Sequence, residues 1–462
     1  MAGATPPREI RIPDAALGIA DTLRVRALDD LTSWNVVESL TTQVGPRPGG
    51  SAADARAVQW AEVMFKTLGY DKVWLQPVSF PRWVRRSERG EILGDYAQPL
   101  TLTALGGSPG GTIEGEVVRF ADLAALEAAP AGSLAGKIAF VDYRMSRARD
   151  GSGYGPGSRT RSRGPSAAIR AGAIGYLMRS AGTDSHRFPH TGATRFDEGL
   201  TPIPSAALSA PDANQLARLA QLGNTLRKPA RVRISLDCGW DGAATSYNVI
   251  GEITGSQHGL RDDVVVIGGH LDSWDLGTGA VDDGAGIGIT MAAGHLIGRL
   301  PKAQRPPRTI RVIAFANEEH GLYGGKAYAD AQAANVARHQ IVAESDFGAG
   351  HIYAFNSNAA PHARGAIAQI AAALKPLGIE TSEKGGPGPD VGPIAEKGAI
   401  WGWLAQDGSD YFDLHHTPDD TLDKIDPAAL AQNTAAYAVF AYLAASADGS
   451  FGSAPKTPAA AP

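Results

Sequence analysis

The sequence predicts an α/β protein in which a mainly parallel sheet lies between layers of helices. From residue 241 to residue 450, short apolar runs alternate with longer segments of helical period. Strands and helices that alternate in this way form a parallel sheet that is covered on both faces. Side chains of metal-binding types follow several of the apolar runs, and α/β proteins place their active groups at the carboxyl ends of such strands.

The individual elements follow from the length and the period of each run. Three apolar runs predict strands at 264–270 (VVVIGGH), 309–316 (TIRVIAFA) and 341–346 (IVAESD). Longer segments rich in alanine, leucine and glycine predict helices at 282–300, 321–332, 361–378 and 427–446. Each predicted strand is followed by a helix, which is the order that a parallel sheet requires.

The remainder of the chain differs in composition. Residues 1–95 indicate helices with turns, including one helix over 51–70 that starts at Ser51, after a loop rich in Gly and Pro at 44–51. Residues 96–240 carry short β-type runs between Gly-rich turns, with a small helix leading into a strand at 164–180. We therefore expect residues 1–95 and 241–450 to form one domain, with 96–240 as an inserted domain of mixed α and β structure, and 451–462 as a flexible tail.

Length and composition exclude several classes of protein. With 462 residues, the chain is long enough for two or three domains of about 150 residues each. A net charge of −5 leaves no basic field for nucleic acid, and no run approaches the roughly 18 apolar residues of a membrane span. The one cysteine, Cys238, excludes an internal disulfide and a cysteine-based zinc cluster.

The informative residues are acids and histidines at the ends of the predicted strands. His270 and Asp272 follow the first strand, Asp282 and Asp283 precede the next helix, Glu318 and Glu319 follow the second strand, Asp346 ends the third, and His416 lies in the polar loop DLHHTPDDT. Taken singly, these residues have ordinary explanations, such as a helix cap for the Asp pair or a hydrogen-bonded structural histidine. Their convergence at one edge of the sheet favours a metal site.

The chemistry of this set indicates two divalent ions. Neighbouring carboxylates repel one another unless a cation neutralises them. Oxygen and imidazole ligands suffice for a pair of metal ions that activates water and polarises a carbonyl. One further carboxylate would serve as the general base, so the predicted reaction is hydrolysis.

Four motifs resemble a known family. The segments GGHLDSWDLGTGAVDDGAG (268–286), ANEEHGLYGG (316–325), ESD (344–346) and HHTPDDT (415–421) are similar to the co-catalytic zinc exopeptidases of the M28 family, and in particular to its carboxypeptidase Q branch. The resemblance extends to GPRPGGS near the start, to PHTG (189–192) and to TSYNVIGEITGS (245–256). It covers most of the chain and keeps the order and spacing of the motifs.

The resemblance implies two Zn²⁺ ions per chain and a role for each residue of the motifs. His270 and Asp346 would bind one zinc ion, Glu319 and His416 the other, and Asp282 would bridge the two. Glu318 would be the general base, and Asp272 would orient His270 through the second nitrogen of its ring. Asp420 is a candidate partner for His416. The fold implied is the zinc-exopeptidase (phosphorylase/hydrolase-like) sheet with a protease-associated-type insert at 96–240.

Substrate residues and quaternary structure are less defined. His190 in PHTG is either a packing residue or a contributor near the active site of a partner subunit. Tyr411 either supplies a phenol to the oxyanion or packs beside its loop, and Asp390 is either a substrate residue or a turn residue in the Gly- and Pro-rich loop 384–393. The resemblance implies a homodimer. It also favours export, although MAGATPPREI contains no signal peptide and the cytoplasm stays open.

The predicted function is that of a binuclear zinc peptidase that hydrolyses dipeptides or the terminal residues of short peptides. The alternative within this class is a carboxypeptidase that releases C-terminal residues such as glutamate. A glutaminyl cyclase-like enzyme with one zinc ion and a non-catalytic receptor on the same fold are two further alternatives. The receptor is disfavoured because all five ligands and the base are present.

Overall fold

The computed structural model describes residues 8–226 and 228–453, which form two compact units. The first unit comprises the described residues of Met1–Ser79, Thr245–Asp407 and Thr421–Pro462, and the second comprises Phe80–Ala244 and Gly408–Asp420. Two long strands, β1 (Lys72–Leu93) and β8 (Arg231–Ile253), contribute residues to both units.

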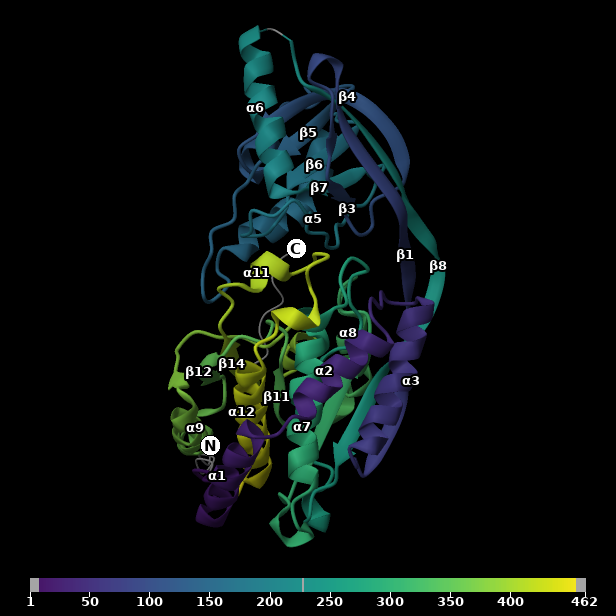
Figure 1. The fold of residues 1–462 in the computed structure, drawn as a ribbon. Helices are drawn as coiled ribbons and strands as arrows, with labels where there is room; N and C mark the ends of the chain where they lie inside the picture. The colour runs from purple at the N-terminus through teal and green to yellow at the C-terminus, as the bar shows by residue number, and fades with distance from the viewer. Residues whose placement is uncertain (1–7, 227, 454–462) are drawn as a thin grey trace, which may run out of the picture. The chain divides into compact units, whose positions relative to one another are not determined.

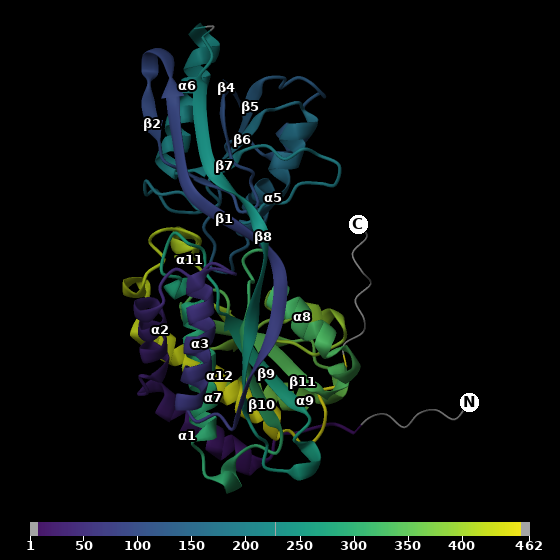
Figure 2. The same cartoon turned by 90° about the vertical axis from the view of Figure 1, so that its right-hand side faces the viewer.

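The first unit is built on a mainly parallel sheet with the order β11–β9–β10–β8. Figure 1 labels β8 and β11 of these strands, and Figure 2 also labels β9 and β10. Strands β9 (Val264–His270), β10 (Thr309–Phe315) and β11 (His339–Glu344) are parallel, and β8 pairs with β10 in the antiparallel direction. All seven residues of β9 are buried, as expected for a strand that is covered on both faces. The parallel sheet predicted from the alternating runs is confirmed.

Helices cover both faces of this sheet (Figure 2). Strand side chains alternate between the two faces, so Val264 and Val266 share one face and pack with Tyr328 of α8 and Ile394 of α10. Helices α7 and α12 pack against the opposite face of β9 and β10. The helices of this unit are α1 (Asp14–Leu28), α2 (Thr32–Gln43), α3 (Ala52–Thr67), α7 (Ala285–Gly298), α8 (Tyr323–Ala331), α9 (Arg364–Leu374), α10 (Gly392–Glu396) and α12 (Pro427–Ser446).

A smaller sheet completes the first unit, with the order β13–β12–β14. Its strands are β12 (Ile352–Ser357), β13 (Glu380–Thr381) and β14 (Gly402–Gln406). Strand β12 is parallel to β13 and antiparallel to β14. These strands follow β11 in the chain, and the loop that carries Asp390 lies between β13 and β14.

In the second unit the strand order is β8–β4–β5–β6–β7–β3, and β8 is the strand that also pairs with β10. The strands β4, β5, β6 and β7 are parallel, while β8 and β3 are antiparallel to their neighbours. The elements are β2 (Gln98–Leu100), β3 (Leu102–Ala104), β4 (Gly111–Phe120), β5 (Lys137–Val141), β6 (Gly175–Arg179), β7 (Ser205–Leu208), α4 (Leu123–Glu127), α5 (Tyr154–Arg170), α6 (Ala210–Leu226) and α11 (Tyr411–Leu414). A protease-associated identity for this unit stays a prediction.

Three local expectations need correction. Residues 72–93, expected to be helical with turns, form strand β1, in which Val78 and Phe80 are buried in alternation. The helix before β6 begins at Tyr154, well before the expected Gly164, and contains Pro165. Helix α7 begins at Ala285 rather than at Asp282, because Asp282 and Asp283 have non-helical backbone angles.

The two ends of the chain lie mostly outside the described part. In the predicted flexible tail, Phe451 is fully buried, while residues 454–462 are outside the described residues. Among the helices that the structure describes, none is both long enough and apolar enough to cross a bilayer.

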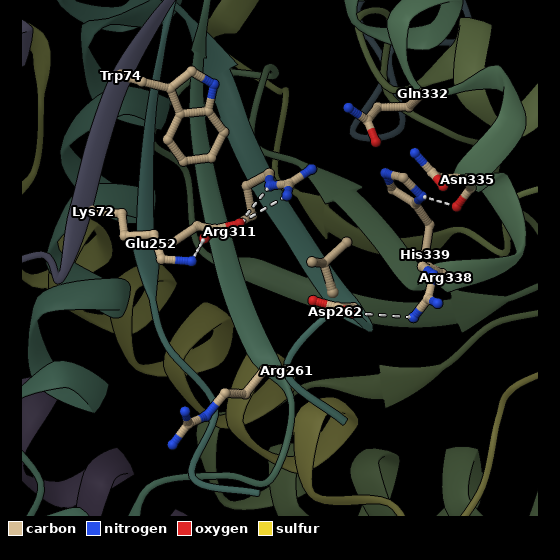
Figure 3. A pocket seen from close by; sticks show the side chains of 11 residues that line it. Lys72, Trp74, Glu252, Arg261, Asp262, Arg311, Gln332, Asn335, Arg338 and His339 are labelled. Carbon is tan, nitrogen blue, oxygen red and sulfur yellow. Dashed lines mark hydrogen bonds and ion pairs between the residues drawn. The ribbon is translucent and has the colours of Figure 1, made fainter. Parts of the chain in front are cut away.

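A pocket of about 410 Å³ opens at the amino ends of β9 and β11 (Figure 3). Glu252 accepts two hydrogen bonds from the Arg311 guanidinium, at 3.0 and 2.7 Å, and Lys72 lies 3.5 Å from its other oxygen. Arg311 also donates to the Tyr328 hydroxyl at 2.8 Å, and this hydroxyl lies 2.8 Å from His339 Nε2. Burial lowers the pKa of His339 to about 4, so this ring is neutral at pH 7. These polar groups on one side of the pocket form hydrogen bonds and an ion pair with one another. We therefore interpret them as a structural network.

We expect Glu252→Ala to lower the free energy of unfolding by about 3 kcal/mol, because the Arg311 guanidinium would then be buried without its carboxylate. Equilibrium denaturation in urea, followed by circular dichroism, measures the change. The control is Glu62→Ala, which breaks the exposed Lys66–Glu62 pair and should cost at most about 0.5 kcal/mol. Equal effects of the two substitutions would contradict this interpretation of the pocket.

Candidate metal centre

Three parallel strands bring the candidate residues of the first unit to one edge of the sheet. His270 is the last residue of β9, and in the register it lies opposite Phe315, the last residue of β10. Glu318 and Glu319 follow β10 after a short turn, and Asp346 follows β11. The convergence at one edge that the sequence predicted is therefore present for the candidates of this unit.

His270 stands at the centre of this group and is 1% exposed. Its Nε2 atom lies 3.1 Å from Asp282 Oδ1 and 3.5 Å from Asp346 Oδ1. Its Nδ1 atom lies 3.0 Å from the main-chain oxygen of Asp272. A carbonyl oxygen only accepts, so Nδ1 carries a proton and Nε2 is directed at the two carboxylates.

Within the first unit, two sets of donor atoms have the spacing of metal ligands. One consists of His270, Asp282 and Glu319, the other of His270, Asp283 and Asp346, and within each set the donor atoms lie within 4.8 Å of one another. Imidazole nitrogen and carboxylate oxygen are ligands that zinc accepts. The donor set therefore fits the metal type that the sequence predicted.

The carboxylates around His270 raise the electrostatic cost of leaving the centre without a cation. Burial raises the pKa of Glu318 well above its usual range, and the nearby Glu319 and Asp346 raise it further. Burial opposes a charge on His270, yet the hydrogen bonds to Asp282 and Asp346 prevail and raise its pKa. Both shifts record an excess of buried negative charge, which divalent cations would offset.

Asp283 contributes to this centre although the sequence analysis gave it no ligand role. Its Oδ2 accepts the His270 amide at 3.0 Å, and its Oδ1 accepts the Gly286 amide at 3.0 Å. It thereby caps the start of α7, as acids at helix starts commonly do, and also holds the end of β9. The peptide bond between Asp282 and Asp283 is cis.

Close backbone packing around Asp283 accounts for the small residues in this region. A Cβ atom on Gly269 would lie 2.3 Å from Asp283 Oδ2, and one on Gly286 would lie 1.9 Å from the main-chain oxygen of Ser345. Neither contact is tolerable, so glycine is required at both positions. Gly269 and Gly286 are therefore needed for close packing around Asp283.

Asp272 is fully buried and contacts His270 through its main-chain oxygen, not through its carboxylate, which is 3.8 Å from His270 Nδ1. Instead, the carboxylate accepts the Glu318 amide at 3.0 Å and the Glu319 amide at 3.4 Å. Asp272 therefore holds the turn that carries the predicted general base and one predicted ligand.

Asp390 lies in a turn, as one alternative predicted, and is fully buried. Its Oδ1 accepts the Gly325 amide at 3.1 Å, and its own amide donates to Glu344 Oε2 at 2.8 Å. Burial raises the pKa of Asp390 to about 8. These contacts attach the loop 384–393 to the end of β11 and to α8, which explains how a loop of this composition is held in place.

The remaining candidates belong to the second unit. His416 has a positive φ of 62°, its Nδ1 lies 3.1 Å from the main-chain oxygen of Thr191, and its main-chain oxygen accepts the Thr191 amide at 3.0 Å. His190 is buried, with Nδ1 2.8 Å from the His415 oxygen and Nε2 2.5 Å from Asp184 Oδ2. The PHTG segment thus holds the backbone and the ring orientation of the two-histidine loop.

Tyr411 starts the short helix α11 and is 8% exposed. Its ring packs on Phe412 and His415, with centroids 5.0 and 5.1 Å apart. The packing alternative for Tyr411 is consistent with these contacts, and a role towards the oxyanion stays a prediction.

The chain is similar to proteins of one known family. The family model "Peptidase family M28" matches residues 248–441. Carboxypeptidase Q of Bos taurus is 31% identical over 415 residues, which cover 89% of this chain and 85% of that protein.

Solved structures give the same result. A peptidase M28 precursor from Shewanella amazonensis is 46% identical, with a TM-score of 0.90 over 96% of this chain and 99% of that one. A zinc aminopeptidase from Bacillus subtilis shares the fold, with a TM-score of 0.63 at 19% identity over 88% of this chain and 94% of that one. The chain therefore belongs to peptidase family M28 and is an exopeptidase of the carboxypeptidase Q-like kind.

Proposed function

We propose that the protein is a zinc carboxypeptidase that removes residues from the carboxyl end of short peptides. The observation that carries this proposal is the buried group of His270, Asp282, Glu319 and Asp346 at one edge of the sheet, in a chain that resembles carboxypeptidase Q over most of its length. The comparisons favour this activity over the dipeptidase activity that the sequence analysis put first.

The proposed ligands are those of the sequence analysis: His270 and Asp346 for one zinc ion, Glu319 and His416 for the other, and Asp282 for both. Four of these residues carry the support of the donor spacing in the first unit. The assignment of His416 rests on the HHTPDDT motif and on its Nδ1 contact with Thr191, which selects the tautomer with Nε2 as the ligand atom. When bound, zinc polarises the peptide carbonyl and lowers the pKa of water.

Glu318 is the proposed general base. Its backbone is held by Asp272, and burial and the neighbouring acids raise the pKa of its carboxyl group, which strengthens it as a proton acceptor. Glu318 would take a proton from the attacking water and pass it to the amine that leaves when the peptide bond breaks. A carboxylate beside the ligands can do both because it is not itself held by the metal.

A second candidate is an aminopeptidase or dipeptidase with the same centre. The fold shared with the zinc aminopeptidase from Bacillus subtilis favours it, although at 19% identity the likeness concerns the fold alone. Both candidates use the same ligands and base and differ in which end of the peptide is bound. We further propose, on the family resemblance, a protease-associated-type second unit, a homodimer and an exported location.

Glu318→Gln should retain the zinc content of the wild type and lose about 10²- to 10⁴-fold in kcat, because it removes the general base and leaves the ligands in place. Metal analysis and peptide turnover measure the two quantities. The neighbouring Glu319→Gln is the matched variant and should lose zinc as well as activity. Loss of zinc in Glu318→Gln, or full activity in it, would contradict the assignment.

Asp282→Ala should lose both bound zinc and activity, because this carboxylate is shared between the two proposed zinc positions. Zinc per chain, measured after dialysis and again after re-addition of zinc, should fall from two in the wild type. Asp262→Ala, at an exposed carboxylate far along β9 from His270, is the control and should keep both. Two zinc ions bound to Asp282→Ala would refute the bridging role.

Blocked substrates distinguish the two modes of hydrolysis. A carboxypeptidase should cleave an N-acetylated dipeptide and fail on a dipeptide amide, because it binds the free carboxylate. An aminopeptidase should show the opposite preference, because it binds the free amine. Release of amino acids from the two blocked peptides, followed by chromatography, decides between them. Cleavage of the free dipeptide alone would indicate a dipeptidase that needs both free ends, and cleavage of none of the three peptides would refute both candidates.

A further inference from the structure

Arg47, in the Gly- and Pro-rich loop 44–51, has no role in the sequence analysis, yet its side chain is completely buried. A buried guanidinium is costly unless its N–H groups are hydrogen-bonded. Four main-chain oxygens accept hydrogen bonds from it: Arg47 donates to Leu271, to Thr278 at 2.7 Å, to Gly279 at 2.9 Å and to Gly45 at 3.3 Å.

Three of these acceptors lie in one loop. Residues 271–279 have no regular secondary structure, and the loop joins His270 at the end of β9 to the segment that carries Asp282. The main chain of Arg47 also pairs with Ser273, whose hydroxyl accepts the Arg47 amide at 3.1 Å and whose amide donates to the Arg47 oxygen at 3.3 Å. The loop is therefore wrapped around this one side chain and its backbone.

The geometry at Gly279 shows how tight this wrapping is. Gly279 has a positive φ of 62°, and a Cβ atom there would lie 2.4 Å from Ser273 Cβ and 2.7 Å from Arg47 Nη1. The loop closes on Arg47 and Ser273 just before it reaches Asp282. Any displacement of the guanidinium would move the main chain that leads into the predicted bridging ligand.

The loop 44–51, which carries Arg47, also lies close to the turn that follows β10. A Cβ atom on Gly49 would lie 2.4 Å from the side-chain oxygen of Asn317, the residue before Glu318. The loop held by Arg47 also carries Asp272, whose carboxylate binds the amides of Glu318 and Glu319. Arg47 is thus linked, through the loop backbone, to residues from β9 and from β10.

We propose that Arg47 is a positioning residue for the metal centre: its planar set of donors sets the path of loop 271–279 and thereby the relative placement of His270 and Asp282. The identity of His270 and Asp282 as ligands rests on the proposed function. The requirement for Arg itself follows from its geometry, because lysine has a point charge and cannot bind several carbonyl groups in fixed directions.

The test compares Arg47→Lys with Arg308→Lys in the full chain. Arg308 is the matched control, because it is also a buried arginine of the first unit, with 4% of the residue exposed. Its guanidinium likewise donates to main-chain oxygens, those of Ala447 and Gly449. It precedes β10 at the amino end of the strand, away from the candidate centre. Three quantities are measured: the zinc dissociation constant by chelator competition, kcat and KM, and hydrogen exchange of the peptide 271–284 in the metal-free protein.

For Arg47→Lys we expect zinc affinity to fall about 10- to 100-fold, the range for residues that orient metal ligands, and kcat to fall with little change in KM. Exchange of the Ser273 and Gly284 amides should become at least about 10-fold faster, in line with the loss of local protection. Arg308→Lys should lower the melting temperature and leave all three quantities near those of the wild type.

Wild-type zinc affinity, kcat and loop exchange in Arg47→Lys, with only a lower melting temperature, would overturn the proposal and leave Arg47 as an ordinary core residue. Should Arg47→Lys not fold, Ser273→Ala removes a contact of the same cradle without changing charge, and it should shift affinity and exchange in the same direction by less; no shift would overturn the proposal. Failure of the proposed function is seen separately, as zinc binding that His270→Ala does not weaken.

Discussion

The constraint on which the first unit depends is the accumulation of buried negative charge where three parallel strands end. Asp282, Asp283, Glu319 and Asp346 gather around His270. Carboxylates in such proximity repel one another, and the loss of water makes each charge more costly. Without support, these carboxylates would move apart and towards solvent. The close-packed backbone, with its glycines and the loop around Arg47, holds them in place.

The buried acids divide into two kinds by their contacts. Asp272, Asp283 and Glu344 each accept two main-chain amides, so their carboxylates join segments that are distant in the chain. Amide hydrogen bonds favour the ionised carboxylate and offset part of the cost of its burial, although burial still raises the pKa of all three acids. Asp282, Glu319 and Asp346 belong to the sets with metal-ligand spacing, and Asp283 belongs to both kinds. One kind shapes the backbone, and the other supports the proposed chemistry.

Two loops that carry predicted site residues are each held by contacts within their own unit. The loop 384–393 is attached to β11 through Glu344 and to α8 through Asp390, while the two-histidine loop of the second unit is held by the PHTG segment. One fold can carry different activities, because the activity depends on the residues placed on the fold and not on the fold itself. Family membership therefore supports the reaction more firmly than the choice of peptide end.

The sequence by itself determined the parallel sheet, its three strands and the acids and histidine at their ends, because periodicity and strand order are local properties. It did not reveal β1, whose partner β8 is distant in the chain, nor the late start of α7, where Asp283 binds the His270 amide instead of continuing a helix. Only the tertiary structure decided that Asp272 holds the Glu318–Glu319 turn and that Arg47 is enclosed by the loop 271–279. Such roles depend on which main-chain groups contact a side chain in the folded protein. A sequence pattern shows the side chains but not their contacts with distant segments.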